Sequence, residues 1–258
     1  MVAGVHPVFL ANLQHLVSCL LAERMTAYWT LLDANAVFRN NDMVTYSILA
    51  NPAYARSFSC TVLPSLTSVI APVTWGIDLC NEPESVVTGE SGNWSETGLD
   101  WPRVGRTLAV IREEIRGFLP RVPVSVGSGW HECKNIRSGI YQELGVELDF
   151  LDYHAQCVGT YVSGFPGGYR GIPVVIGELG IGSDPSVPVT HTVWRAAQDQ
   201  LGTKLYVALQ GQYDAVFLWY SNDTHDRDRG GLVYGSEVGP ALYAVAKRCG
   251  GSIRSCPS

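Results

Sequence analysis

The sequence is poor in charged residues and has no long apolar stretch. Only 16% of its 258 residues are Asp, Glu, Lys or Arg, and the formal net charge is -6. Binding to nucleic acid or to an anionic membrane surface is not expected, because both need clustered Lys and Arg, and no such cluster is present. No segment reaches about 18 uninterrupted apolar residues, so no membrane-spanning helix is expected. A neutral partner fits this composition best.

Internal repeats, low-complexity linkers and a secretory signal are also missing. The segment Met1–Pro7 has no basic region and no processing site, so a secretory signal is expected to be either absent or already removed. Seven cysteines are nevertheless many for a cytosolic enzyme of this size. Cys249 could pair with Cys256, and Cys133 with Cys157. Together with two glycosylation sequons, the cysteines slightly favour a secreted or extracellular protein.

Apolar runs of strand length alternate along the chain with segments of helical periodicity. The expected strands are 25–32, 73–80, 122–126, 148–153, 172–180 and 215–220. The expected helices are 9–23, 54–70, 100–118, 135–145, 191–208 and 239–248. This alternation predicts an α/β protein in which helices connect parallel strands, and the chain is short enough for one domain over 1–258.

Two of the expected strands end in a glutamate. The apolar run Trp75–Pro83 closes with Asn81 and Glu82, and the run Ile172–Gly180 carries Glu178 near its end. Retaining hydrolysis of a glycosidic bond needs such a pair, one carboxylate to attack the anomeric carbon and the other to protonate the leaving oxygen. The sequence therefore predicts a glycosidase-like site with the two carboxyl groups about 5 to 5.5 Å apart.

These motifs resemble those of the retaining β-glycosidases of clan A, most closely glycoside hydrolase family 5, which includes cellulases and mannanases. The resemblance covers residues 25–248 and implies a TIM-type (β/α) barrel that hydrolyses β-linked oligo- or polysaccharides. It implies that Glu82 is the acid/base, that Glu178 is the nucleophile, and that Asn81 binds the substrate 2-hydroxyl. Glu178 must act ionised and Glu82 protonated. No metal or organic cofactor is needed for this chemistry.

Other residues match the family pattern only in part. His154 matches the histidine that ends strand 6, and Trp219 matches the aromatic platform at strand 8. Asn35 stands where the family has a histidine, and Gln156 where it has a tyrosine. With Trp130, on a strand-end loop, these residues form the expected substrate-binding set. Because the family arginine near strand 2 also has no equivalent, the alternative is a catalytically degenerate barrel that binds glycans or serves another role.

The number of expected strands falls short of a complete barrel. If the strand that ends at Glu82 is the fourth, the strand 25–32 is the third, and only 24 residues precede it. Two βα units need about 60 residues, so about six of eight units are expected, with Val5–Phe9 the only trace of the first two. The outer edge of strand 25–32 and the opposite edge of strand 215–220 are then unpaired and need to be covered. Either the segment Val2–Phe9 or a second copy of the chain supplies the cover, and we slightly favour the homodimer.

Overall fold

The computed structural model describes residues 4–87, 98–129, 139–155, 171–179, 203–208 and 213–218. The chain divides into two compact units, unit 1 (Met1–Leu151) and unit 2 (Asp152–Ser258). Within each unit the described strands follow one another in chain order. The expectation that the whole chain forms one domain stays a prediction.

Unit 1 is built on three parallel strands. They are β1 (Ala27–Thr30), β2 (Thr74–Asn81) and β3 (Val124–Ser128), and β2 pairs with both of the others. β3 is buried along its whole length and β2 along its central five residues. Burial on both faces explains why the sequences of β2 and β3 are rich in apolar residues without strict alternation. The three strands expected in this region are confirmed.

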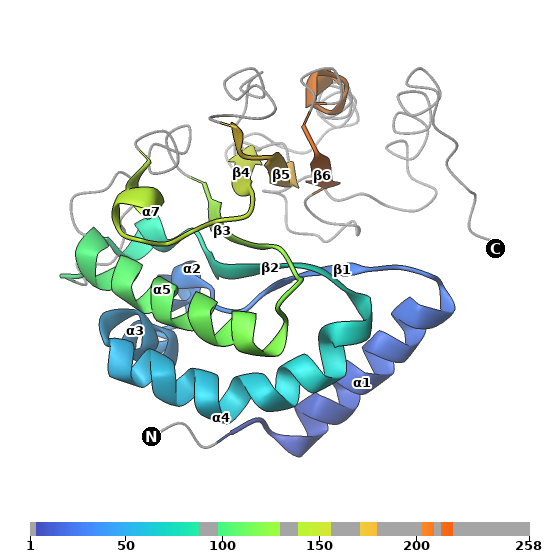
Figure 1. Ribbon diagram of the computed structural model, residues 1–258, viewed down its shortest axis with the longest axis horizontal. Helices are drawn as coiled ribbons and strands as arrows, with labels where there is room; N and C mark the ends of the chain where they lie inside the picture. Colours follow the sequence, from blue (N-terminus) through green and yellow to red (C-terminus); the bar gives the residue numbers. More distant parts are fainter. Residues whose placement is uncertain are drawn as a thin grey trace, which may run out of the picture. The chain divides into compact units, whose positions relative to one another are not determined.

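Helices fill the connections between these strands, and α4 and α5, which are in contact, lie side by side in Figure 1. The α-helices among the described residues of unit 1 are α1 (Pro7–Ala22), α2 (Ala34–Arg39), α3 (Met43–Ala50), α4 (Pro52–Ile70), α5 (Trp101–Phe118) and α7 (Ile140–Glu143). Two short 3-10 turns, η1 (Ala71–Val73) and η2 (Pro83–Val86), flank β2. The helices α2 and α3 were not predicted, although Asp33 and Asp42 cap their first turns.

The helix α5 matches its prediction most closely. The Asp100 carboxylate accepts a hydrogen bond from the Arg103 backbone N–H at 2.8 Å, as expected of an N-cap. Four residues of the predicted apolar stripe are buried: Val104, Leu108, Ile111 and Ile115. Phe118 was placed on the same stripe but is 41% exposed, because it is the last residue of the helix.

The N-terminal segment is a helix and not the strand fragment expected at Val5–Phe9. Pro7 occupies the first turn of α1, where its missing N–H has no cost, and the His6 side chain accepts a hydrogen bond from the Val8 backbone N–H. The helix packs against α4 and η1. The fragment Val5–Phe9 is therefore not a strand in the described residues, and what covers the outer edge of β1 stays a prediction.

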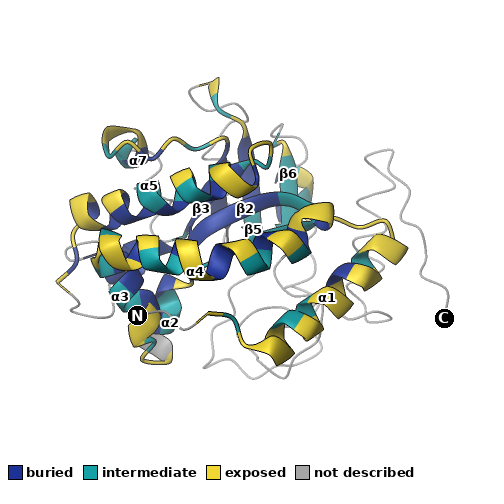
Figure 2. Cartoon of the chain, turned by 60° about the horizontal axis from the view of Figure 1, so that its bottom comes forward, coloured by how far each residue is buried: buried dark blue, intermediate teal, exposed yellow. Residues whose placement is uncertain are grey.

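The helix α1 presents a broad apolar surface to solvent. Its 16 residues include no Asp, Glu, Lys or Arg, and Val17 is its only buried residue. Val8, Phe9, Leu16 and Leu21 are each 45 to 60% exposed, and Figure 2 shows the helix mostly in the colour of exposed residues. Apolar surface of this kind is typical of an interface. The homodimer stays a prediction. Among the described helices, none has both the length and the apolar character that crossing a bilayer would need.

Aromatic side chains pack at the amino ends of the strands of unit 1. Tyr28, Trp75 and Phe150 have ring centroids 5.4 to 5.6 Å apart. Gly76 lies among them, and a Cβ at this position would lie 3.3 Å from the Tyr28 ring. Close packing of this kind stabilises the amino ends and leaves the carboxyl ends, where barrel enzymes carry their chemistry, to other residues.

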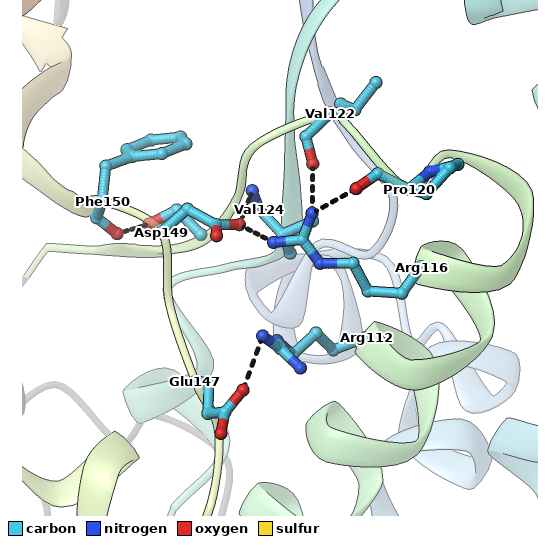
Figure 3. A network of polar contacts seen from close by, with 9 residues as sticks. Arg112, Arg116, Pro120, Val122, Val124, Glu147, Asp149 and Phe150 are labelled. Carbon is cyan, nitrogen blue, oxygen red and sulfur yellow. Dashed lines mark hydrogen bonds and ion pairs between the residues drawn. The ribbon is translucent and has the colours of Figure 1, made fainter.

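A polar network also lies at the amino ends of the strands of unit 1 (Figure 3). Arg116, near the end of α5, donates hydrogen bonds to the carbonyl oxygens of Pro120 and Val122 at 3.2 and 3.1 Å and pairs with Asp149. The Asp149 carboxylate also accepts from the Val124 backbone N–H at 2.7 Å. The network thus ties the end of α5 to the start of β3, which fixes the register of the strand.

The described part of unit 2 contains the strands β4, β5 and β6. β4 (Leu151–Ala155) begins at the unit boundary, and β5 (Val174–Leu179) pairs in parallel with β6 (Ala215–Leu218). Residues 203–208 are helical, within the helix expected at 191–208. These strands match the three that were expected, and the last expected helix, at 239–248, lies outside the described residues.

Candidate active site

Glu82 follows β2 directly and has an unusual backbone conformation. Its φ and ψ angles are 46° and 57°, in the left-handed region that few residues other than glycine adopt. The turn is held on both sides, because the Glu82 N–H donates to the Gly127 carbonyl at 2.9 Å and the Ser85 N–H donates to the Glu82 carbonyl at 3.0 Å. A strained backbone of this kind persists only where its surroundings fix it, and it is often found at functional positions.

The Glu82 carboxyl group lies between an amide and a glycine. Asn35 Nδ2 donates a hydrogen bond to Glu82 Oε2 at 2.8 Å. On the other side is Gly129, where an added Cβ would lie 2.1 Å from Glu82 Oε1 and 2.5 Å from its Cδ. The Glu82 side chain is 9% exposed. An added Cβ at position 129 would therefore displace the Glu82 carboxyl group from its hydrogen bond with Asn35.

Asp33 links the two asparagines that the sequence placed in the site. Its Oδ1 accepts hydrogen bonds from the Asn35 backbone N–H at 3.0 Å and from Asn81 Nδ2 at 2.9 Å. Asn35 was expected to bind substrate, but in this structure its amide bonds Glu82. Asn81, also expected to bind substrate, uses one of its two amide hydrogens on Asp33. Asp33 thus holds the Asn81 side chain and the Asn35 backbone, a role that sequence reasoning did not assign.

Two further carboxylates are buried behind Glu82, and neither was predicted as part of the site. Asp78 is 2% exposed, and its Oδ1 accepts from the backbone N–H groups of Cys80 and Gly127, both at 2.9 Å. Glu84 is 3% exposed, and its Oε1 accepts from the Gly129 N–H at 2.6 Å. Their only signal in the sequence is their spacing of two and four residues from Glu82.

Cys80 lies among these carboxylates, and its thiol is unreactive. Burial raises the pKa of its thiol well above the usual range, and the negative charges of Asp78 and Asp33 raise this pKa further. The thiol therefore stays protonated and is a poor nucleophile. Cys19, Cys60 and Cys80 are free thiols, whereas both disulfides considered from the sequence involve cysteines outside the described residues.

In unit 2, a buried histidine lies between two carboxylates. His154 Nδ1 is 3.4 Å from Glu178 Oε2, and His154 Nε2 is 3.7 Å from Asp152 Oδ1. The side chains of Asp152, His154 and Glu178 are 1%, 4% and 12% exposed. Gly177 permits this packing, since a Cβ there would lie 2.0 Å from Asp152 Oδ1. An imidazole donates to both carboxylates only in its protonated form.

Asp152 was missed by sequence reasoning, although a signal was present. Asp152 and His154 are alternate residues of β4, so their side chains lie on one face of the strand. At the end of this strand, Lys204 Nζ donates to the Ala155 carbonyl at 3.3 Å, and this lysine is only 3% exposed. A buried lysine thus holds the backbone at the residue that follows His154.

Three expected site residues cannot be placed. Trp130, Gln156 and Trp219 lie outside the described residues. Glu82 belongs to unit 1 and Glu178 to unit 2, so the spacing of 5 to 5.5 Å expected between their carboxyl groups stays a prediction. The structure places one glutamate in each unit at the carboxyl end of a parallel strand, with Asn35 beside Glu82 and His154 beside Glu178.

Comparisons with known proteins identify the fold. No protein-family model matches the sequence, and no curated protein matches it. Among solved structures, the chain is similar to the β-mannanase from the blue mussel Mytilus edulis, with a TM-score of 0.64 and 14% identity over 98% of this chain and 76% of the mannanase. It is also similar to the β-1,4-mannanase from the sea hare Aplysia kurodai, with a TM-score of 0.61 and 14% identity over 88% of this chain and 72% of that one. A third match is the β-glucosidase from Thermotoga maritima, with a TM-score of 0.58 and 12% identity over 93% of this chain and 78% of the glucosidase.

These three proteins are glycoside hydrolases, and identities of 12 to 14% show a shared fold alone. The chain therefore has the TIM-type (β/α) barrel fold of such enzymes. Its described residues contain six of the eight strands of a complete barrel. The predicted fold class, an incomplete TIM-type barrel, is confirmed.

Proposed function

We propose that this chain is a retaining β-glycosidase of the family 5 type, which hydrolyses β-linked oligo- or polysaccharides by double displacement. One observation carries the proposal: Glu82 and Glu178 each lie at the carboxyl end of a buried parallel strand, and each has a defined polar neighbour. TIM-barrel enzymes carry their active sites at this end of the strands. The mannanases and the β-glucosidase that share the fold support a β-linked glycan as substrate.

In the first chemical step, the Glu178 carboxylate attacks the anomeric carbon and forms a glycosyl ester. Glu82 transfers its proton to the glycosidic oxygen, and the bond between that oxygen and the anomeric carbon breaks. The leaving sugar departs as a neutral alcohol. In the second step, the Glu82 carboxylate takes a proton from water as the water attacks the anomeric carbon, and Glu178 is released as a carboxylate. Both glutamates return to their starting states.

The neighbours of the two glutamates suit these roles. Asn35 donates to Glu82 whatever the pH, because an amide does not titrate, and this bond holds the carboxyl group both before and after it gives up its proton. His154 contacts Glu178 from β4, so it can hold the nucleophile in one orientation. Asp152, on the far side of the ring, orients the imidazole in turn.

Turnover by matched variants tests the proposal. Wild type, Glu82→Gln and Glu178→Gln are assayed on aryl β-glucosides and β-mannosides and on mannan, cellulose-like and β-1,3-linked glucans. Glu178→Gln is expected to abolish turnover on every substrate, whereas Glu82→Gln spares substrates whose leaving groups depart without protonation. Glu113→Gln, an exposed carboxylate on α5, is the control and leaves turnover unchanged.

Two results would contradict this proposal. If Glu82→Gln lowers turnover equally on activated and unactivated substrates, Glu82 is not the acid. If the wild type hydrolyses nothing on the panel but binds oligosaccharides, the chain is a degenerate barrel that binds glycans. The change from the family histidine to Asn35 is the observation that favours this second candidate, since it removes a titratable group from the site.

A further inference from the structure

Glu84 is a buried carboxylate that the two-glutamate mechanism leaves unused. It lies in the turn η2, two residues after Glu82, and is 3% exposed. Burying a carboxylate costs several kcal/mol unless hydrogen bonds compensate. Part of the compensation is the Gly129 backbone N–H, which donates to Glu84 Oε1 at 2.6 Å. This distance is typical of a strong, charge-assisted hydrogen bond.

Gly129 is also the residue against which the Glu82 carboxyl group packs. It follows β3 directly, and a Cβ at this position would lie 2.1, 2.5 and 3.0 Å from Glu82 Oε1, Cδ and Cγ. The same backbone segment is anchored two residues earlier, because the Gly127 N–H donates to Asp78 and the Gly127 carbonyl accepts from the Glu82 N–H. Two buried carboxylates therefore fix the segment 127–129, and Glu84 holds its end nearest to the glutamate side chain.

We infer that Glu84 is a positioning residue for Glu82, acting through the backbone of Gly129. Its carboxylate holds the Gly129 N–H, and the Gly129 backbone limits the Glu82 carboxyl group to the position in which it accepts from Asn35. Without this bond the segment 127–129 loses one of its anchors, and Glu82 gains room to move away from Asn35. The catalytic consequence rests on the proposed function, whereas the geometric consequence does not.

The geometric consequence is tested by NMR of the Asn35 side-chain amide. Glu84→Leu and Glu84→Met both remove the acceptor oxygen at similar volume, and Glu84→Gln keeps an oxygen for the Gly129 N–H. In the Leu and Met variants we expect the chemical shifts of the Asn35 Nδ2 protons to move to those of a free amide. In the Gln variant we expect these chemical shifts to stay near their wild-type values. If the Asn35 resonances stay unchanged in a folded Leu or Met variant, the inference is wrong.

The catalytic consequence is tested by kinetics on two classes of leaving group. Because Glu84→Leu would misplace Glu82, we expect this variant to lower kcat/KM about 10- to 100-fold for unactivated glycosides and only a few-fold for activated aryl glycosides. We expect Glu84→Gln to keep most of the wild-type kcat/KM on both classes. An equal loss on both classes would mean that Glu84 serves the fold alone. A wild type that hydrolyses nothing overturns the proposed function instead, and the NMR result still decides the role of Glu84. Glu113→Leu is the control, since this exposed carboxylate leaves both readouts unchanged.

Discussion

A single methyl group at position 129 is expected to separate catalysis from stability. In Gly129→Ala, the new Cβ would lie 2.1 Å from Glu82 Oε1, well inside ordinary van der Waals contact at 3.4 Å. The carboxyl group must therefore retreat by more than about 1 Å, a displacement that costs a catalytic group about 100-fold in rate, or about 2.7 kcal/mol. The retreat also stretches or breaks the hydrogen bond from Asn35 Nδ2.

The cost to folding is expected to be much smaller. The atoms that must move are the end of one flexible side chain, so a loss of about 1 kcal/mol in the free energy of unfolding is expected. The control is Gly117→Ala near the end of α5, where no atom outside the adjoining helix backbone lies within 4 Å of the new Cβ. Alanine there is a better helix former than glycine, and a gain of up to about 1 kcal/mol is expected with no change in rate.

The assay compares kcat/KM on an unactivated glycoside with the midpoint of urea unfolding for both variants. We expect Gly129→Ala to lose about 100-fold in kcat/KM while its unfolding midpoint stays close to that of the wild type. Full activity of Gly129→Ala would refute the reasoning, because it would mean that the position of the Glu82 carboxyl group does not matter. A loss of activity that only follows unfolding would refute it as well.

Three further predictions follow from other contacts. Gly177→Ala should destabilise unit 2 by about 2 to 3 kcal/mol in chemical unfolding, because the buried Asp152 carboxylate lies 2.0 Å from the new Cβ, and a neutral result would contradict this packing. Burial tends to raise the pKa of Asp42, but hydrogen bonds from Thr45 and Val44 in the first turn of α3 outweigh burial and hold this pKa below its ordinary value. The stability that Asp42 contributes is therefore present above about pH 4 and is lost as the pH falls through the lowered pKa. Asp42→Asn should flatten the fall of Tm in acid below about pH 4, and an unchanged slope would argue against this contribution. If the homodimer forms through α1, wild type should scatter light as a dimer at low micromolar concentration and a variant with Phe9→Ser and Leu16→Ser as a monomer, whereas a wild type that is monomeric on dilution would exclude the dimer.

Much of the fold was predictable because buried parallel strands leave a strong pattern. β2 and β5 appear in the sequence as apolar runs that end in polar residues, and the structure places both within one or two residues of the expected bounds. The helices α2 and α3 were missed because each is short, with 6 and 8 residues, and helical periodicity is weak over so few positions. The N-terminal helix was shortened in the prediction because the cap at His6 is not a common one.

Within the candidate site, only the residues that belong to a sequence motif could be predicted. Glu82 and Glu178 follow from their strand-end motifs, but the residues that hold them are recognisable only in three dimensions. The Glu84 carboxylate accepts a hydrogen bond from the backbone N–H of Gly129, which follows a different strand. A sequence pattern cannot show which backbone N–H a carboxylate will bind. Gly129 and Gly177 are needed for their missing Cβ atoms, and this need becomes visible only when the opposing carboxylates are placed. Polar contacts between strands are therefore the part that the sequence does not encode locally.

The most direct test of the central claim is to trap the covalent intermediate on its nucleophile. A 2-deoxy-2-fluoro β-glycoside with a good leaving group slows the second step more than the first, so a retaining enzyme accumulates as the glycosyl ester. After digestion, mass spectrometry is expected to find one fluoroglycosyl group on the peptide that contains Glu178, and none in Glu178→Gln. Hydrolysis of natural substrate without any label, or a label on another residue, would contradict the account.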